Sequence, residues 1–208
     1  MRQTKDNLLR AMLWGSAFVS VAVLLTIVGY LFYKGFSYIS FDFIFGDYSP
    51  VGGGGIFPMI VTTIYTIIIS LIIATPIGIL AAVYLHEYAK QGRLVRIIRY
   101  ATESLTGIPS IIYGLFGAVF FVAILKLGMS IIAASLTLTI IVLPVIIRTT
   151  EEALKTVPAS YREGSLALGT TKLQTLYKVI LPSAMPGILS GIILSIGRIV
   201  GESAAIFL

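Results

Sequence analysis

The segment SYREGSLALGTTKLQTLYKVILP, residues 160–182, interrupts an otherwise apolar sequence and decides how the chain is interpreted. It lies between two long hydrophobic runs and contains Arg162, Glu163, Lys172 and Lys178. Hydrophobic residues make up 57% of the 208-residue chain and charged residues only 12%, which is too apolar for an ordinary soluble domain. We therefore expect a membrane protein that keeps a polar insert between two of its spans.

A helix needs about 17 to 25 mainly apolar residues to cross the hydrocarbon core of a bilayer. Five runs meet this requirement: 11–33, 56–84, 108–127, 129–147 and 180–208. The segments between them are interpreted as an N-terminal tip at 1–10, an extracytoplasmic loop at 34–55, and a polar connection at 148–179. The predicted fold class is all-α, a polytopic transmembrane helical bundle. Because the last run is still apolar at Leu208, we expect the C-terminal end to be truncated.

The positions of Lys and Arg predict the orientation, since short cytoplasmic loops accumulate positive charge. Twelve of the fifteen basic residues fall in residues 1–10, 85–107 and 148–179, and the others are Lys34, Lys126 and Arg198. This pattern predicts a multi-pass protein of the cell membrane with a cytoplasmic N-terminus. The basic residues do not gather on a soluble face with interleaved aromatic residues, so we expect lipid around the chain and no nucleic acid partner.

The connection at 148–179 contains three helix-start patterns of the capping-box kind, namely Thr149-x-x-Glu152, Ser160-x-x-Glu163 and Thr171-x-x-Gln174. In such a box a hydroxyl accepts from a backbone N–H, and the Glu or Gln reaches back. Pro158 separates the first predicted helix from the second, and Gly169 can end the second in the left-handed conformation. These signals predict a compact helix–turn–helix on the cytoplasmic side.

Leu173, Leu176, Tyr177 and Ile180 recur at helical spacing and form a predicted apolar stripe. Helices of two or three turns are marginal alone, so this stripe must be buried against something. It could lie on the membrane surface or pack beneath the protein's own spans. It could also insert into a groove on a soluble partner.

The order EGSLALG, nine residues and VILP resembles the EAA loop of ABC importer permeases, whose pattern is E-A-A-x3-G-x9-I-x-L-P. Glu163, Gly169, Leu181 and Pro182 match this pattern, whereas Gly164, Ser165 and Val179 depart from it by small changes. The resemblance implies a bundle of the MetI-like type, in which the insert is the coupling loop to a separate ATPase. The coupling residues that it implies are Glu163, Gly164, Ser165, Ala167, Gly169, Leu181 and Pro182.

Further segments resemble the phosphate transport permeases, more closely one of their two paralogous subunits than the other. These segments are GGIFPMIVTTIY, PIGILAAVYLHEYA, GIPSIIYGLFG, LPVIIRTTEEALKTVPASYREGSLALG and GRIVGESAA, which cover most of the chain after residue 50. The resemblance implies that 56–208 forms half of a translocation pathway for inorganic phosphate. It also implies three partners: a dimer of ABC ATPase subunits, a paralogous companion permease and an extracytoplasmic phosphate-binding protein.

The last apolar run carries an Arg and a Glu where charges are costly. Gly187, Gly191 and Ser195 share one helical face, which favours close helix packing in lipid, and Arg198 and Glu202 continue that face. An Arg at mid-membrane costs about 2.5 to 3.5 kcal/mol on insertion scales, so we expect Glu202 to pair with it. The pair could fix helix packing. It could also border the translocation pathway, which the resemblance implies because the phosphate permeases have an Arg and a Glu at the matching positions.

The remaining candidates are weaker. His86 and Glu87 fit an interfacial loop better than a metal or proton site, and residues 107–114 fit a helix start better than a pore-facing backbone. The chain contains no G-x-x-x-x-G-K-[ST] motif, so we expect no ATP site, no cofactor and no catalytic or metal site here. Three alternatives stay open: a permease for another oxyanion such as sulfate or molybdate, an ion channel, and a membrane enzyme.

Overall fold

The computed structural model describes residues 2–49, 54–203 and 205, and the chain divides into two compact units, Met1–Ile60 and Val61–Leu208. The first unit contains α1 (Arg2–Gly35), a 3-10 turn η1 (Phe36–Tyr38) and the short helix α2 (Phe41–Phe45). The hydroxyl of Ser40 caps α2 by accepting from the Phe43 N–H at 3.1 Å. The apolar side chains described in α1 are exposed, as expected of a helix that faces lipid.

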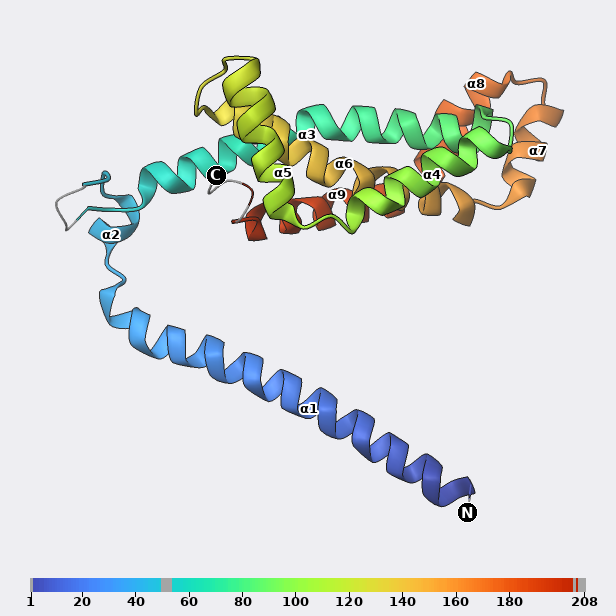
Figure 1. The fold of residues 1–208 in the computed structure, drawn as a ribbon. Helices are drawn as coiled ribbons and strands as arrows, with labels where there is room; N and C mark the ends of the chain where they lie inside the picture. The colour runs from blue at the N-terminus through green and yellow to red at the C-terminus, as the bar shows by residue number, and fades with distance from the viewer. Residues whose placement is uncertain (1, 50–53, 204, 206–208) are drawn as a thin grey trace. The chain divides into compact units, whose positions relative to one another are not determined.

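Helices make up the rest of the described chain, and the first of them, α3, begins just before the second unit (Figure 1). In chain order they are α3 (Phe57–Val83), η2 (Tyr84–Tyr88), α4 (Arg93–Thr106), α5 (Ser110–Gly117), η3 (Ala118–Ile124), α6 (Ile131–Thr156), α7 (Ala159–Ala167), α8 (Lys172–Thr175), η4 (Leu176–Ile180) and α9 (Leu181–Gly201). The segments η2, η3 and η4 are π-helical turns. No strand occurs in the described residues, which confirms the all-α prediction.

In the described part of the chain, four helices are long and apolar enough to cross a membrane: Leu9–Tyr38, Phe57–Tyr88, Ile131–Thr156 and Lys172–Gly201. A fifth crossing exists only if α4 and the α5–η3 segment count as one broken span, because the two are bent by 98°. The segment 85–107, which the charge pattern predicts to be a connection, therefore contains a helix of its own. The predicted span 108–127 corresponds to the shorter helical segment Ser110–Ile124.

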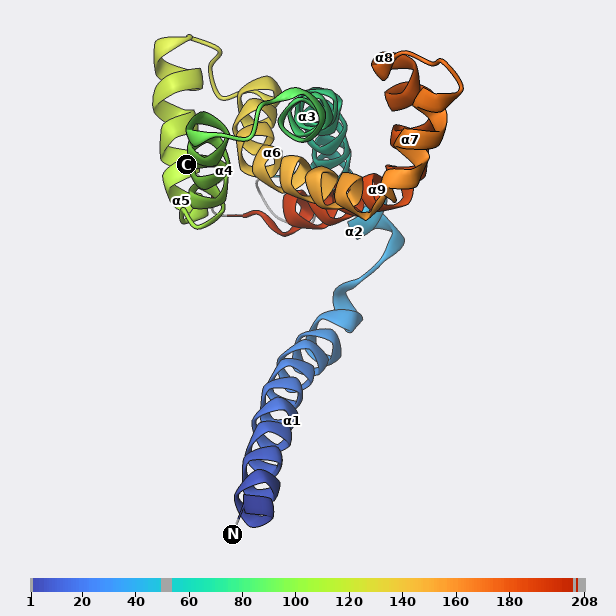
Figure 2. The ribbon, with the colours of Figure 1, turned by 90° about the vertical axis from the view of Figure 1, so that its right-hand side faces the viewer.

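The helix α6 packs against both α3 and α9 (Figures 1 and 2). Gly78 of α3 lies against Ile146, and a β-carbon at position 78 would come 2.6 Å from the Ile146 Cγ2. The Ser70 hydroxyl donates to the Ser135 carbonyl at 3.0 Å, and Thr139 donates to the Ser70 carbonyl at 3.4 Å. Small residues and hydroxyls that bridge helices are the means by which spans associate in lipid, where the hydrophobic effect gives no help.

The predicted small-residue face of α9 is confirmed by its contacts with α6. A β-carbon at Gly187 would lie 2.6 Å from the Ala153 Cβ, one at Gly191 would overlap the Thr149 side chain, and Ser195 is fully buried. The spans close around two apolar clusters. The pocket-side core is Ala74, Tyr113, Leu138, Ile141, Val142, Ile146, Ile199 and Ala205, and the hairpin-side core is Val83, Ala153, Leu154, Val157, Leu176, Ile180, Ala184 and Ile188.

Candidate functional site

The predicted helix–turn–helix is present at residues 158–180, which we call the polar hairpin. Its first helix, α7, begins after Pro158, and Gly169 ends that arm with a φ of +83°, a conformation that suits glycine. Its second arm starts at a capping box, in which the Gln174 N–H donates to the Thr171 hydroxyl and the Gln174 side chain accepts from the Thr171 N–H at 3.0 Å. The third predicted capping box is therefore confirmed.

The other two predicted capping boxes are wrong. Thr149 lies inside α6, and its hydroxyl donates back to the Val145 carbonyl at 2.8 Å. Ser160 is the second residue of α7, which has no side-chain cap at Pro158. The pattern S/T-x-x-E/Q can form a cap only where the chain leaves the helical conformation, and α6 continues unbroken to Thr156.

Three hydroxyls lock the two arms of the polar hairpin together. Ser165 contacts Thr170 at 2.8 Å and Thr175 at 3.0 Å, and Thr170 contacts Thr175 at 2.8 Å. The Thr170 hydroxyl also donates to the Ser165 carbonyl at 2.8 Å, and Ser165 and Thr175 are buried. Serine at position 165, a departure from the alanine of the EAA pattern, thus closes the turn of this hairpin.

The remaining predicted coupling residues divide between the exposed turn and the base of the polar hairpin. Glu163, Gly164, Ala167 and Gly169 are exposed, and no hydrogen bond or ion pair in the described part of the chain engages the Glu163 carboxylate. Leu181 packs at the edge of the hairpin-side core, and Pro182 occupies the first turn of α9. The turn of the hairpin is therefore exposed, while the residues that follow the hairpin pack in the spans.

The predicted apolar stripe is split between two environments. Leu176 and Ile180 are buried in the hairpin-side core, whereas Leu173 and Tyr177 are 56% and 57% exposed. The break coincides with the π-helical turn η4, whose wider hydrogen-bonding pattern changes the angular step between residues. Within this chain only half of the predicted stripe is buried, so burial of the other half against lipid or a partner stays a prediction. Leu168, which is 86% exposed, is a further exposed apolar side chain of the hairpin.

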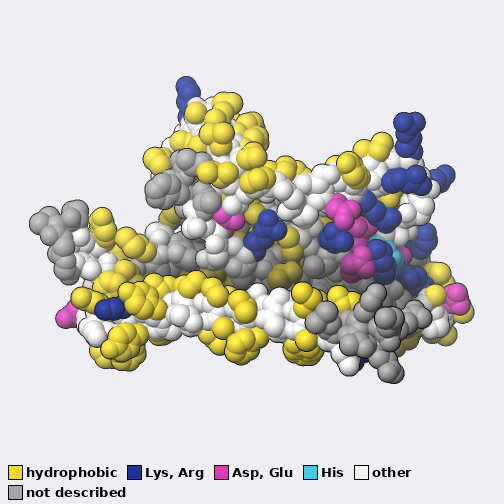
Figure 3. All heavy atoms as spheres, turned by 60° about the horizontal axis from the view of Figure 1, so that its bottom comes forward, with side chains coloured by type: hydrophobic (Ala, Val, Ile, Leu, Met, Phe, Trp, Pro, Cys, Tyr) yellow, Lys and Arg dark blue, Asp and Glu magenta, His cyan; other side chains and the backbone are white. Residues whose placement is uncertain are grey.

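Ion pairs join distant segments of the second unit, and the sequence interpretation missed them. Glu87 binds Arg162, Arg99 contacts Glu151 at 3.1 Å, and Arg148 contacts Glu103 at 3.0 Å. Figure 3 shows acidic and basic side chains gathered on one part of the surface, while hydrophobic side chains cover much of the rest. The two residues of each pair lie far apart in sequence, so no local sequence pattern predicts these ion pairs.

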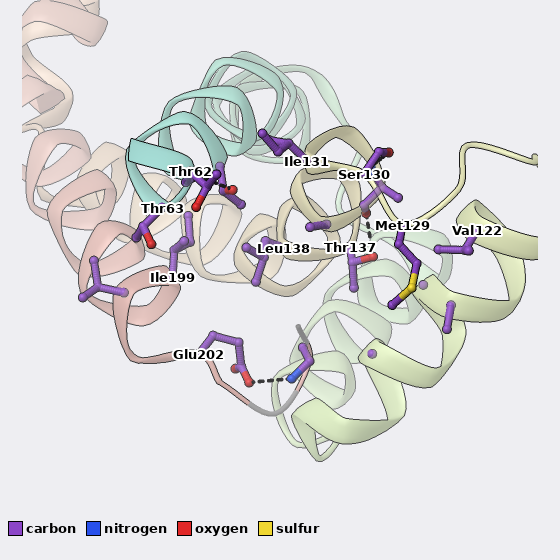
Figure 4. A pocket seen from close by; sticks show the side chains of 18 residues that line it. Thr62, Thr63, Val122, Met129, Ser130, Ile131, Thr137, Leu138, Ile199 and Glu202 are labelled. Carbon is purple, nitrogen blue, oxygen red and sulfur yellow. Dashed lines mark hydrogen bonds between the residues drawn. The ribbon is translucent and has the colours of Figure 1, made fainter. Parts of the chain in front are cut away.

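A pocket of about 380 Å³ lies at the other end of the spans in the second unit (Figure 4). It is lined mainly by small and hydroxyl-bearing residues, among them Thr62, Thr63, Thr66, Ser130 and Thr137, and Glu202 is the acidic residue in its lining. Gly114 also lines it, within α5, which begins at Ser110; this confirms a helix start at 107–114.

The expected ion pair between Arg198 and Glu202 is not formed. The helix α9 ends at Gly201, and Glu202 has an extended backbone, so the two residues are no longer one helical turn apart. The Glu202 carboxylate instead accepts from the Ala205 N–H at 3.2 Å. Arg198 is partly buried, it does not line the pocket, and it has no ion-pair partner in the described ranges.

Comparison with known proteins agrees with this architecture. Residues 74–208 match the family described as binding-protein-dependent transport system inner membrane component. The chain is 37% identical over 206 residues to the probable ABC transporter permease protein YqgI of Bacillus subtilis, an alignment that covers 99% of this chain and 70% of that protein. It is 40% identical over 153 residues to the phosphate transport system permease protein PstA 1 of Mycobacterium tuberculosis, which covers 74% of this chain and 50% of that protein.

A solved structure of the MetNI methionine ABC transporter, in an inward-facing conformation, contains a chain of similar fold. The TM-score is 0.59 at 28% sequence identity, over 73% of this chain and 70% of that chain. The family match, residues 74–208, includes the polar hairpin and most of the pocket lining, whereas Thr62, Thr63 and Thr66 of that lining precede it. The chain therefore belongs to the family of binding-protein-dependent transport system inner membrane components, the permeases of ABC transporters.

Proposed function

We propose that this chain is the permease subunit of an ATP-driven importer of inorganic phosphate, with the polar hairpin and the N-terminus in the cytoplasm. The observation that carries the proposal is the exposed surface of the hairpin. Its short helices expose Leu168, Leu173 and Tyr177, and they expose the Glu163 carboxylate, which has no hydrogen-bond or ion-pair partner among the described residues. Exposed apolar side chains on a polar insert fit a cleft on a protein partner better than they fit water.

The polar hairpin is built to transmit a movement. A dimer of ABC ATPase subunits would hold it in a cleft and would shift it when the dimer closes on ATP. Because Leu176 and Ile180 are buried with Ala153 and Ala184, the hairpin would carry α6 and α9 with it. The spans would then rock between inward-open and outward-open states, as a two-state element biased by a ligand on another chain. This chain itself would need no cofactor.

Arg198 and Glu202 are our candidates for the translocation pathway. A partly buried guanidinium without an ion-pair partner in the described residues supplies positive potential to an anion, and Glu202 borders the 380 Å³ pocket. A companion permease of the PstC type would complete the pathway, and an extracytoplasmic phosphate-binding protein would deliver the solute. The relative named as a phosphate transport system permease supports phosphate as the solute.

Uptake into membrane vesicles that contain the assembled transporter tests this proposal. We expect ATP-dependent accumulation of labelled phosphate that unlabelled phosphate suppresses and that sulfate and molybdate leave unchanged. Suppression by sulfate or molybdate instead would assign the chain to another oxyanion. Conductance of the purified permease without ATP would contradict the coupled mechanism.

A further inference from the structure

A carboxylate in the turn that follows α3 binds the first arm of the polar hairpin. Glu87, in the π-helical turn η2, accepts from the Arg162 Nε at 3.1 Å and also from Arg162 Nη2, both through Oε1. The same oxygen lies 3.0 Å from the His86 Nδ1. Seventy-five residues separate Glu87 from Arg162, so this contact joins two distant parts of the chain.

The contact between Glu87 and Arg162 is shielded from water. The two side chains are 18% and 26% exposed, so solvent screens their attraction less than it screens a surface pair. A second contact lies beside it, where the Lys172 ammonium stands 6.0 Å from the centroid of the Tyr88 ring. Glu87, Arg162 and Lys172 line a small cavity of about 50 Å³ between η2 and the hairpin, so charged side chains contribute to the contact between these surfaces.

The first arm of the hairpin, α7, has two sets of polar contacts with the rest of the chain. In the first set, Ser165 binds the hydroxyls of Thr170 and Thr175, and the chain continues from Thr175 through η4 into α9. In the second set, Arg162 binds Glu87, which lies in η2, the turn that directly follows α3. Among the described residues 64–88, no other hydrogen bond or ion pair leads to α7. The polar contacts of α7 therefore lead to α9 through hydroxyls and to the end of α3 through one ion pair, in addition to the apolar core in which Val83 packs with Leu176 and Ile180.

We infer that Glu87 and Arg162 are positioning residues that transmit the displacement of the hairpin to α3, so that one docking event moves two spans together. This inference rests on the proposed function, since it assumes that a partner pushes on α7. Arg162 is next to the exposed Glu163 in sequence, but its own side chain is partly buried against η2. The ion pair thus lies directly behind the surface that the partner would contact.

A double-mutant cycle tests the role of the pair. The variants Glu87→Gln, Arg162→Gln and the double variant are compared in the assembled transporter by phosphate uptake and by ATP hydrolysed per phosphate moved. We expect each single variant to keep its bound ATPase but to lose at least about fivefold in uptake, within the usual range of coupling energies. The double variant should be no worse than either single variant, and Arg162→Lys should retain more uptake than Arg162→Gln. Additive losses would overturn the inference.

The exposed pair of Glu152 and Lys155, 2.8 Å apart in α6, is the matched control. Neutralising both residues removes an ion pair near the hairpin without touching α3, and it should leave uptake and stoichiometry unchanged, as expected of an exposed pair. If this control lost as much as Glu87→Gln, the effect would reflect general loss of charge and the inference would fail.

A distance measurement separates the inference from the proposed function. Spin labels at Tyr84→Cys and Ser160→Cys, both exposed positions, report the spacing of η2 and α7 without any partner bound. We expect a narrow distance distribution that broadens in Glu87→Gln and in Arg162→Gln. An unchanged distribution would overturn the link itself. If the distance behaves as expected but Glu163 variants retain both the ATPase and uptake, the proposed function fails while the structural link stands.

Discussion

The backbone of Gly191 in α9 lies against the side chain of Thr149 in α6, so closely that a β-carbon at position 191 would overlap the threonine hydroxyl. Thr149 is held in place, because this hydroxyl donates to the Val145 carbonyl at 2.8 Å. The contact sets the distance between the two helices that flank the polar hairpin. Substitution at Gly191 must therefore separate these helices or break the hydrogen bond of Thr149.

We predict that Gly191→Ala lowers the unfolding free energy by about 1 to 3 kcal/mol, the usual cost of overpacking. Gly197→Ala is the control, because a β-carbon at position 197 meets no atom within 4 Å. Thermal unfolding of both variants in the same detergent gives the comparison. Equal midpoints for the two variants would contradict the close approach of α6 and α9.

The capping box at Thr171 gives a second prediction. Thr171→Ala removes the oxygen that accepts from the Gln174 N–H, and such caps contribute about 1 kcal/mol. Hydrogen exchange at the amides of α8 should become faster. Ser160→Ala is the matched control, since Ser160 begins the same sequence pattern and caps nothing. Faster exchange at α7 in Ser160→Ala would show that the second capping box forms after all.

The hydroxyl cluster gives a third prediction. Ser165→Ala removes two hydroxyl contacts but leaves Thr170 and Thr175 bonded to each other, so a loss of about 0.5 to 1.5 kcal/mol is expected. Thr175→Val should cost a similar amount, because it also removes two hydroxyl contacts and leaves Ser165 and Thr170 bonded to each other. Proteolysis of the hairpin in detergent compares the variants. An unchanged proteolysis rate in either variant would contradict the cluster geometry.

Arg198 and Glu202 give a fourth prediction. Because they do not form an ion pair, uptake losses in Arg198→Gln and Glu202→Gln should add in the double variant, within about 0.3 to 0.5 kcal/mol. Both single variants should keep their bound ATPase, since Arg198 lies in the last turn of α9 and Glu202 directly follows it, at the end away from the hairpin. A coupling energy of more than about 1 kcal/mol would indicate that the two charges meet during transport.

Features encoded by short-range chemistry could be predicted from the sequence. The left-handed Gly169, the Thr171 capping box and the small-residue face of α9 each depend on a few neighbouring residues, and the structure contains all three. The exposed position of Glu163 is also consistent with its expected role, although only a binding experiment tests that role. Local patterns succeed here because the polar segment must satisfy its backbone groups without help from distant residues.

Features that depend on long-range packing could not be predicted in the same way. The segment 93–106 carries three arginines and is predicted to lie in a connection, yet it forms the helix α4, whose Arg99 and Glu103 form ion pairs with Glu151 and Arg148 of α6. The expected pairing of Arg198 with Glu202 assumes that α9 continues one turn further than it does. A helix end, a π-helical turn and an ion pair between distant segments are set by the whole fold, so a sequence window does not reveal them.

The most direct test of the account asks which soluble subunits remain attached when the assembled transporter is purified in mild detergent. We predict that ATPase subunits co-purify with the parent chain and with Glu152→Lys, an exposed acidic residue outside the polar hairpin. They should be lost from Glu163→Lys and from Leu168→Asp, although both variants insert normally into the membrane. Retention of the ATPase by both hairpin variants, together with full phosphate uptake, would contradict the claim that the polar hairpin is the docking site.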